Sequence, residues 1–498
     1  MAAVTTATRL RATLLLTVLA IQVLWLSGAS SAAPAVLTIV HFNDAHEIDL
    51  LDDGAGGGLA RVATLIARTR RQAQPTMVTF GGDLFSPAAV GTAVVDGEPL
   101  AGRQAVAVMN MLGVDWMTFG NHEFDLSEQA FRARLREKTF GIVSTNVTDA
   151  AGRPLAGTVP EAVMMLEAGG TTVRVGVIGL TLDTNPKPWV RYRPEITAAR
   201  EQVARLRGRV DAIVALTHLT MARDVALVTA VPDIDLVLGG HEHENWILRR
   251  GPRLTPIMKA DSNGRSAAIA TLTVAGQGQR PQVNGWVEPL GVAVEPEPRV
   301  HAEIRRWMGL GFEGFRRAGF APEATIGVIP APLDGRESVV RTQPGALTAL
   351  ILASLRREVP DAAVVFFNAG AVRLEDVIAA GPVRQYDVLR LLPFGGTAIG
   401  ARFDGALLAR VLDAGIANIG TGGYLHVAGA RREEAGWTVA GERIDPAKQY
   451  RVAFNDFLLT GREIGLGFLT RSHPQVRDVG EYRDVRLAMI DEIAGGLR

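Results

Sequence analysis

The sequence predicts an α/β protein with two α/β domains, and three observations lead to this prediction. Apolar, β-rich runs alternate with stretches of helical periodicity in the first half of the chain, as they do in parallel sheets covered by helices. A stretch rich in Gly and Pro, 276–298, closes that half, and a second α/β pattern begins near residue 321. The length of 498 residues also corresponds to about two to four domains of ordinary size.

The expected strands of the first half are short apolar runs, and the expected helices lie between several of them. The strands are 36–42, 77–80, 116–119, 141–145, 173–179, 212–216 and 236–238, and the helices are 59–72, 102–112 and 198–207. A charged helical stretch over 300–318 follows them. We therefore expect a first domain over 34–298, a linker helix over 299–320 and a second domain over 321–498.

Composition excludes several classes of protein and site. Apolar residues make up 47% of the chain and charged residues 21%, so the chain is not mainly disordered. The 52 Lys and Arg balance 52 Asp and Glu. This balance argues against a nucleic-acid partner, because non-specific binding depends on clustered positive charge. Cys is absent from the sequence, which removes disulfides, thiol nucleophiles, iron–sulfur clusters and Cys-ligated zinc.

The first 33 residues have the layout of a secretory signal peptide. Arg9 and Arg11 precede an apolar run over 14–26, and small residues fill 27–33. This order of basic, apolar and small residues is typical of a cleaved signal, and the run is shorter than the ~20 residues of a membrane span. We expect a periplasmic or secreted protein without a stable membrane anchor after cleavage. An uncleaved N-terminal anchor is the alternative.

Five short polar clusters each follow an apolar run of the first half. They are 44–46, 81–83, 120–125, 217–218 and 239–243. Six of the nine histidines lie in or beside them: His41, His46, His122, His218, His241 and His243. Ligands bind outside the carboxyl ends of the strands in open α/β sheets, so the five clusters are expected to converge on one rim.

The donor types in these clusters suit two divalent cations. Oxygen and imidazole ligands favour Mn, Zn, Fe, Co or Mg over copper(I). Asp44 and His46 share a face of an extended segment, as do His241 and His243, because side chains two positions apart point the same way. Asp83 after two glycines suits a carboxylate that bridges two ions. Each cluster alone is a weak signal, whereas the ordered set of five is specific.

The ordered motifs Asp-x-His, Gly-Asp, Gly-Asn-His-Glu, Thr-His and Gly-His-x-His resemble those of the calcineurin-like metallophosphoesterases. The longer motif Asn-His-Glu-Phe-Asp, the export signal and the second domain make the chain similar to the bacterial and animal 5′-nucleotidase family. The resemblance runs from about Val36 to Phe468. It implies a four-layer α/β metallophosphatase sandwich over 34–298 and an α/β substrate-binding domain over 321–498.

The resemblance also implies a dinuclear metal centre and a catalytic pair. The first ion would be bound by Asp44, His46, Asp83 and His243, and the second by Asp83, Asn121, His218 and His241. Some relatives have Gln in the place of His243. His122, with Asp125 orienting its ring, resembles the family's transition-state pair. For Asp125 the alternative is a helix-capping residue.

In the second domain the resemblance implies a nucleoside 5′-phosphate pocket. The residues that match it are Arg341, Asn368, Gly370, Arg373, Phe394, Phe457 and Glu463. Two of them, Phe394 and Phe457, would hold a base between their rings, and the alternative is that both are core residues. The stretch 344–353 is apolar where the family is polar, and Glu463 stands where the family has Asp. These departures bear on nucleoside specificity more than on phosphate chemistry.

These expectations describe an exported dinuclear phosphoesterase that hydrolyses nucleoside 5′-phosphates to nucleoside and phosphate with metal-activated water. The alternatives on the same scaffold are a 2′,3′-cyclic phosphodiesterase, a nucleotide-sugar or dinucleotide pyrophosphatase, and a thiosulfate-ester hydrolase. A nucleotide-binding protein without catalysis is a further alternative, and the complete set of expected metal ligands argues against it.

Overall fold

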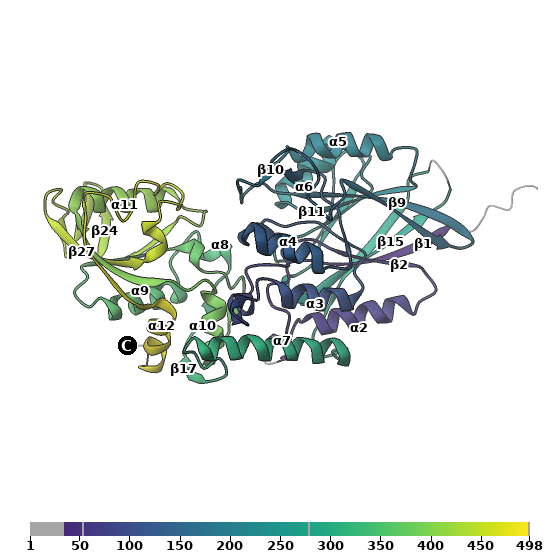
Figure 1. The fold of residues 1–498 in the computed structure, drawn as a ribbon. Helices are drawn as coiled ribbons and strands as arrows, with labels where there is room; N and C mark the ends of the chain where they lie inside the picture. Colours follow the sequence, from purple (N-terminus) through teal and green to yellow (C-terminus); the bar gives the residue numbers. More distant parts are fainter. Residues whose placement is uncertain (1–33, 52–53, 277–278, 497–498) are drawn as a thin grey trace, which may run out of the picture.

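The computed structural model describes residues 34–51, 54–276 and 279–496, and the predicted signal segment lies outside the described residues. Two lobes are joined by the long helix α7 (Pro298–Arg317), which runs beneath the N-terminal lobe toward the C-terminal one (Figure 1). Among the described residues, no helix combines the length and the apolar character that a membrane crossing requires.

The N-terminal domain contains two six-stranded sheets. The first has the order β16 (Gln282–Pro289), β15 (Ser266–Val274), β1 (Ala35–Phe42), β2 (Thr76–Phe80), β5 (Trp116–Met117) and β6 (Gly141–Ile142). The second has the order β13 (Trp246–Arg250), β14 (Thr255–Lys259), β12 (Leu236–Gly239), β11 (Ala212–His218), β9 (Thr171–Thr181) and β8 (Glu161–Ala168). Two short pairs complete it: β3 (Val94–Val95) with β4 (Glu98–Pro99), and β7 (Val147–Asp149) with β10 (Val190–Tyr192).

The two sheets pack face to face with helices on both outer sides, which gives four layers. In β1, Leu37 and Ile39 enter the core between the sheets, while Val40 and Phe42 face the outer helices. This period of two explains why the strand reads as a continuous apolar run, since both of its faces are buried. The helices on the outer sides are α2 (Leu59–Arg70), α3 (Arg103–Leu112) and α4 (Glu128–Glu137) for the first sheet, and α5 (Glu195–Leu206) and α6 (Met221–Ala230) for the second.

The parallel pairing predicted from the alternation is present in both sheets, but each sheet also has antiparallel strands. Strands β1, β2, β5 and β6 are parallel, as are β9, β11, β12 and β14. Strands β8, β13, β15 and β16 pair antiparallel. The stretch 276–298 was expected to be a Gly- and Pro-rich closure, yet it contains β16 at a sheet edge. Only Val283 of that strand is buried, so its apolar pattern is weak.

The C-terminal domain is a five-stranded sheet with helices on both faces. Its order is β23 (Leu425–Ala428), β19 (Val364–Asn368), β27 (Gln449–Asn455), β22 (Thr397–Asp404) and β28 (Val476–Asp484). Helices α9 (Ala346–Glu358) and α12 (Val485–Ala494) pack on one face, and α11 (Gly405–Ala417) packs on the other. The shorter elements are α8 (Glu337–Val340), α10 (Gln385–Leu391), β17 (Thr325–Ile329), β18 (Leu333–Asp334), β20 (Val377–Ile378), β21 (Gly381–Arg384), β24 (Ala430–Glu433), β25 (Gly436–Val439) and β26 (Glu442–Arg443).

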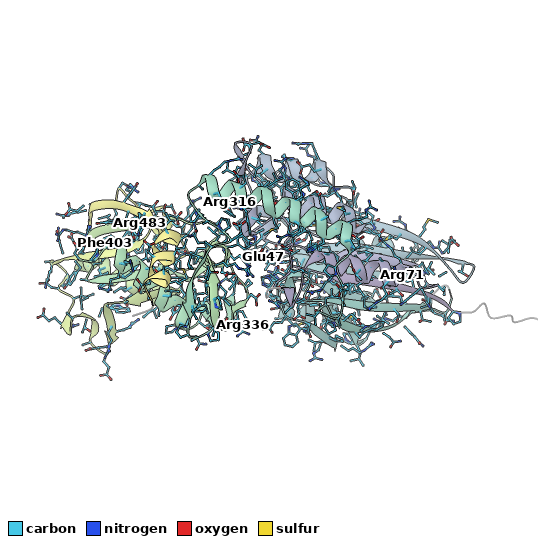
Figure 2. All side chains as sticks on the ribbon, turned by 90° about the horizontal axis from the view of Figure 1, so that it is seen from below. Glu47, Arg71, Arg316, Arg336, Phe403 and Arg483 are labelled. Atoms are coloured by element: carbon cyan, nitrogen blue, oxygen red, sulfur yellow. The ribbon has the colours of Figure 1, made fainter. Side chains whose placement is uncertain are left out.

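Helix α7 and a set of polar contacts hold the two domains together. Trp307 of α7 belongs to the N-terminal core, whereas Phe315 near its end belongs to the C-terminal core. Glu47 lies in the loop after β1. Its carboxylate accepts a hydrogen bond from the Tyr386 hydroxyl at 3.0 Å and forms an ion pair with Arg390 at 3.3 Å. Figure 2 shows Glu47 where the two lobes meet. The two domains are therefore joined by polar side-chain contacts as well as by helix α7.

Candidate metal centre and substrate site

The polar clusters that follow the parallel strands converge on one rim of the N-terminal domain, and unusual backbone angles bring them together. Asp44, Asp83, His241 and His243 have positive φ angles of 50°, 61°, 83° and 59°. Non-glycine residues seldom adopt this region, and such angles persist where the surrounding structure enforces them, often at functional sites. The expectation that Asp44 with His46, and His241 with His243, share a face of an extended segment is therefore wrong, because the backbone is not extended at the first residue of either pair. Tight turns, and not strand geometry, orient them.

The first cluster joins Asp44, His46, Asp83 and His243. Their ligand atoms all lie within 4.8 Å of one another. His243 Nε2 lies 3.1 Å from Asp44 Oδ1 and 3.4 Å from His46 Nε2. Two imidazole nitrogens that converge beside buried carboxylates have the arrangement of ligands around one cation.

The second cluster lies on the other side of Asp83. His218 Nε2 is 3.1 Å from Asp83 Oδ2, and its Nδ1 donates to the Gly81 carbonyl at 2.8 Å, which fixes the tautomer that turns Nε2 toward the carboxylate. The His241 ring lies 5.3 Å from the His218 ring. Asn121 Oδ1 is buried and has no hydrogen-bond partner among the described residues. Asp83 thus contacts both clusters.

The buried polar atoms of these clusters fit a metal ion. Six of them lack a hydrogen-bond partner within the described part of the chain: Asp44 Oδ1, His46 Nδ1, Asp83 Oδ2, Asn121 Oδ1, His218 Nε2 and His243 Nδ1. Buried polar atoms are nearly always paired, so such atoms call for a ligand. Carboxylate, imidazole and amide donors together suit Mn, Zn, Fe, Co or Mg.

The charges of the carboxylates dominate the electrostatics here. Burial opposes a charge on His218, but Asp83 and Asp44 outweigh it and raise the pKa of His218 to about 9. Burial and the neighbouring His243 instead lower the pKa of His46 to about 4. Burial and His218 likewise lower the pKa of His241 to about 3. The carboxylates of Asp44 and Asp83 therefore place negative charge in a buried site, where a positively charged group must balance it.

Two buried residues outside the predicted ligand set hold the rim in shape. The Glu123 carboxylate accepts hydrogen bonds from the backbone N–H groups of Asp83, Leu84, Phe85 and Gly120. Burial and the charge of Asp83 raise the pKa of Glu123 to about 7. Lys259 of β14 is fully buried and donates to the carbonyls of Leu219 and Gly240. Glu123 is part of the Asn-His-Glu motif, so the sequence could have indicated its importance. Nothing in the sequence distinguishes Lys259 from other lysines.

His122 and Asp125 form a pair at the mouth of the metal cluster. His122 Nδ1 lies 2.7 Å from Asp125 Oδ2, and Asn185 Nδ2 donates to Asp125 Oδ1 at 2.9 Å. The N-cap of the following helix α4 is Ser127, whose hydroxyl accepts from Ala130 N–H. The helix-capping alternative for Asp125 is therefore wrong. Burial opposes the charge of Asp125, but His122 and then Arg373 hold its pKa below the usual value.

The polar members of the predicted substrate residues in the C-terminal domain form two groups. Arg341 and Arg373 both face the Glu337 carboxylate, Arg341 in a close ion pair and Arg373 at 3.9 Å. Burial and the charge of Arg373 lower the pKa of Arg341 to about 10. Asn368 Nδ2 donates to Glu463 Oε2 at 2.7 Å. Glu337, which sequence reasoning missed, thus anchors the arginine pair.

The two predicted aromatic residues are at the surface. Phe394 is 52% exposed and Phe457 is 37% exposed, so the alternative that they are core residues is wrong. The Arg373 guanidinium lies 6.0 Å from the Phe394 ring centre. At Gly370, an added Cβ would lie 3.0 Å from the Gly422 Cα, so only glycine allows this loop to approach so closely. The Arg462 guanidinium lies 5.6 Å from the Phe457 ring centre, so each of the two exposed rings has an arginine beside one face.

Two family models match the chain. One is described as calcineurin-like phosphoesterase and matches residues 37–245, and the other is described as 5′-nucleotidase, C-terminal domain, and matches residues 325–468. The chain belongs to the 5′-nucleotidase family of the calcineurin-like phosphoesterases. This confirms the family and the two-domain α/β architecture predicted from the motifs. Members of this class use divalent metal ions, and the Asp44 cluster is the candidate site for them in this chain.

Individual relatives agree with this family. The trifunctional nucleotide phosphoesterase protein YfkN of Bacillus subtilis is 26% identical over 500 residues, which cover 88% of this chain and 32% of that protein, so the chain spans about a third of its length. Protein UshA of Yersinia enterocolitica is 27% identical over 489 residues, 85% of each protein. A 5′-nucleotidase precursor from Thermus thermophilus shares the fold, with a TM-score of 0.74 at 23% identity over 92% of this chain and 96% of that one. The chain is a metal-dependent phosphoester hydrolase.

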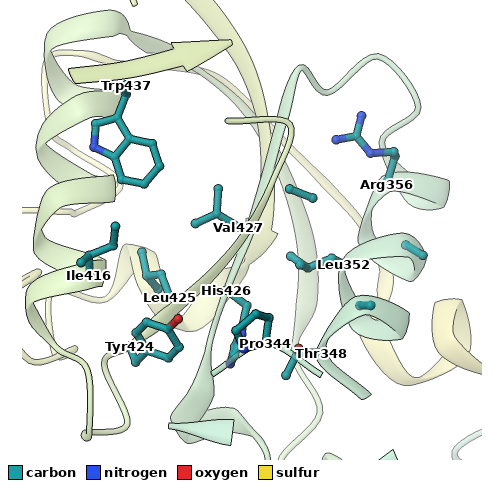
Figure 3. Close-up of a pocket in the computed structure, with 13 residues that line it drawn as sticks. Pro344, Thr348, Leu352, Arg356, Ile416, Tyr424, Leu425, His426, Val427 and Trp437 are labelled. Carbon is teal, nitrogen blue, oxygen red and sulfur yellow. The ribbon is translucent and has the colours of Figure 1, made fainter. Parts of the chain in front are cut away.

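The C-terminal domain also contains a cavity that none of the metal-cluster residues or the two arginines lines. It measures about 550 Å³ and lies between α9, α11 and the edge strand β23 (Figure 3). The stretch 344–353, which departs from the family pattern, contributes Pro344, Thr348 and Leu352 to its lining. Within that lining, His426 Nε2 donates to the Val340 carbonyl at 2.7 Å, next to Arg341. The apolar substitutions of this stretch therefore line a cavity at the sheet edge.

Proposed function

We propose that this enzyme hydrolyses nucleoside 5′-phosphates to nucleoside and phosphate, with the phosphate held between its two domains. The single observation that carries the proposal is a contact across the domains: Glu375 of the C-terminal domain lies 3.4 Å from His243 of the metal cluster and also holds the backbone N–H of Glu337, whose side chain faces Arg341 and Arg373. The arginine pair thus lies on the side of the C-terminal domain that meets the metal cluster. A phosphoester between them would contact groups of both domains.

We propose two divalent metal ions at the rim. Asp44, His46, Asp83 and His243 would bind one ion, and Asp83, Asn121, His218 and His241 the other. Mn, Zn, Co, Fe and Mg are all compatible with these donors. Two bound cations supply an activated water and neutralise the charge of the phosphoryl group.

The residues around the metal ions would bind and orient the phosphate. His122 holds a proton on Nδ1 against Asp125, which leaves Nε2 directed to the phosphoryl oxygens in a fixed ring orientation. Arg341 and Arg373 supply forked donors that match phosphate oxygens. Positioning and charge neutralisation are the main demands of phosphoryl transfer.

The leaving nucleoside would lie on the C-terminal domain. A base between the exposed rings of Phe394 and Phe457 would gain about 1–3 kcal/mol by stacking. Asn368 and Glu463 would contact the ribose, and Gly370 would let the backbone approach it. Relatives named 5′-nucleotidase support a nucleoside phosphate as the substrate.

A second candidate is another phosphoester or related ester hydrolase on the same scaffold, such as a cyclic phosphodiesterase or a pyrophosphatase. Glu463 favours it, because both of its oxygens already accept hydrogen bonds within the protein. Oε2 accepts from Asn368 and Oε1 from the Ile464 N–H. Each oxygen keeps one further lone pair for a ribose hydroxyl, so the ribose contact is weaker than with a free carboxylate.

Phosphate release by the purified mature protein tests the proposal. The protein is treated with a chelator, reloaded with Mn, Zn, Co or Mg, and assayed on AMP, UMP, ATP, UDP-glucose, a 2′,3′-cyclic nucleotide and p-nitrophenyl phosphate. Asp83→Ala should abolish turnover, and Asp49→Ala, which removes a carboxylate of the loop after β1 that pairs with Arg305, should not. Turnover of AMP and UMP supports a nucleotidase. Turnover of cyclic or sugar-linked substrates alone would support the second candidate.

We also propose that the enzyme is exported to the periplasm or the medium after cleavage of residues 1–33. The basic, apolar and small-residue order of that segment supports this. We expect a small phosphoester as its substrate and no nucleic-acid partner. Cell fractionation with mass spectrometry of the mature N-terminus tests the proposal, and a full-length protein retained in the cytoplasm would contradict it.

A further inference from the structure

A carboxylate from the C-terminal domain lies against a predicted metal ligand of the N-terminal domain. Glu375 Oε2 is 3.4 Å from His243 Nδ1. Both side chains are largely buried, with 11% and 13% of their surface exposed. Glu375 has a positive φ of 50°, a conformation that a surrounding structure must enforce. The contact joins two residues that belong to different domains.

The same carboxylate oxygen also holds the element that carries the arginine pair. The backbone N–H of Glu337, at the start of α8, donates to Glu375 Oε2 at 3.1 Å. The side chain of Glu337 in turn faces Arg341 and Arg373. Glu375 therefore lies directly between the histidine of the metal cluster and the group that would bind the phosphate.

The chemistry of a metal-bound histidine gives this contact a role. A histidine that binds an ion through Nε2 carries its proton on Nδ1, and an acceptor for that proton fixes the tautomer, the ring orientation and the basicity of the ligand. His218 finds this acceptor in Gly81 of its own domain. For His243, the Glu375 carboxylate lies 3.4 Å from Nδ1, longer than an ordinary N–H···O hydrogen bond, and would accept this proton in this arrangement of the two domains.

We propose that Glu375 is a positioning residue that couples the metal centre to the arrangement of the domains. It orients His243 for the ion on one side and holds α8 with its arginine pair on the other. Because linkage is reciprocal, an ion at His243 stabilises this domain arrangement as much as the arrangement strengthens binding of the ion. This inference rests on the proposed role of His243 as a metal ligand.

Two substitutions at Glu375 separate this role from a general effect on the fold. Both of its contacts go to Oε2, while Oε1 has no hydrogen-bond partner among the described residues. Glu375→Gln keeps an acceptor oxygen for both contacts, whereas Glu375→Ala removes it. Glu358→Ala is a matched control, since Glu358 is an equally buried glutamate of the same domain that pairs with Arg483.

Calorimetric titration of the chelator-treated full chain with Mn²⁺ tests the proposal. We expect Glu375→Ala to weaken Mn²⁺ binding by roughly 10- to 100-fold, and Glu375→Gln and Glu358→Ala to bind like the wild type. Wild-type affinity in Glu375→Ala, equal loss in Glu375→Gln, or equal loss in Glu358→Ala would each overturn it.

His243→Ala distinguishes this proposal from the proposed role of His243 as a metal ligand. If it binds Mn²⁺ like the wild type, the metal role of His243 itself is wrong. If it loses affinity while Glu375→Ala does not, only the coupling is wrong.

Discussion

Lys259 offers a sharp test of how the rim is held together, because its charge is fully buried. Its Nζ donates to the Leu219 carbonyl at 2.6 Å and to the Gly240 carbonyl at 2.8 Å, and it lies 3.0 Å from Asp224 Oδ2. Lys259 and Asp224 are both 0% exposed. The two carbonyls belong to the loops that follow β11 and β12; His218 is the last residue of β11, and His241 lies in the loop after β12.

We expect Lys259→Met to destabilise the N-terminal domain strongly. Removing one partner of a buried pair leaves an uncompensated charge on Asp224, which costs about 3–5 kcal/mol. For a domain of this size each kcal/mol lowers the melting temperature by about 2–4 °C, so the decrease should be roughly 6–20 °C. Because the Gly240 carbonyl also loses its donor, the turn before His241 should loosen and Mn²⁺ affinity should fall.

Urea unfolding and calorimetry of Lys259→Met, Asp224→Asn, their double variant and one control variant measure the effect. The double variant Lys259→Met/Asp224→Asn should recover part of the lost stability, since it removes the unpaired charge, and the two changes should be non-additive. Lys448→Met, at an exposed lysine of the C-terminal domain, is the control. A change below about 1 kcal/mol in Lys259→Met, or strict additivity in the double variant, would refute the reasoning.

Three further predictions concern the catalytic pair, the aromatic clamp and acid stability. Asp125→Ala removes the 2.7 Å hydrogen bond to His122, worth about 1.5–3 kcal/mol for a charged partner; kcat should fall roughly 10- to 100-fold with metal content unchanged, and an unaltered kcat would contradict it. Phe394→Ala should raise KM for AMP roughly 5- to 100-fold and leave p-nitrophenyl phosphate hydrolysis intact; equal losses on both substrates would argue against stacking. Burial lowers the pKa of His41 to about 4, below its unfolded value of ~6.5, so the unfolded state binds more protons between these values. Stability should therefore fall by up to about 3 kcal/mol as pH drops through this window, and His41→Gln, followed by urea unfolding with chelator present, should flatten the loss; parallel pH profiles would count against it.

The short-range features of this protein follow from its sequence. Strand β1 has apolar residues on both faces, so its run of apolar residues predicts a buried strand without knowledge of its neighbours. The ordered polar clusters that follow such strands predict a rim of metal ligands, because the ends of parallel strands meet at one edge. The structure brings Asp44, His46, Asp83 and His243 together as that order indicates. The roles of the individual ligands stay predictions.

Other features could not be read from the sequence, because they depend on which distant segments come into contact. Strand β16 has only one buried residue, so its pairing with β15 leaves no apolar pattern. The positive φ angles of Asp44, Asp83, His241 and His243 are imposed by turns packed against one another. Their chemistry was predictable, and their geometry was not.

The sequence by itself determined the two α/β domains, the order of the metal-binding motifs and the types of donor they supply. These depend on local periodicity and on residue chemistry, which are written along the chain. Only the tertiary structure decided that Lys259 supports the loops of His218 and His241, that Glu337 anchors two arginines and that Glu375 reaches His243 from the other domain. A buried charge acts on whatever lies within a few ångströms, and only folding determines those neighbours.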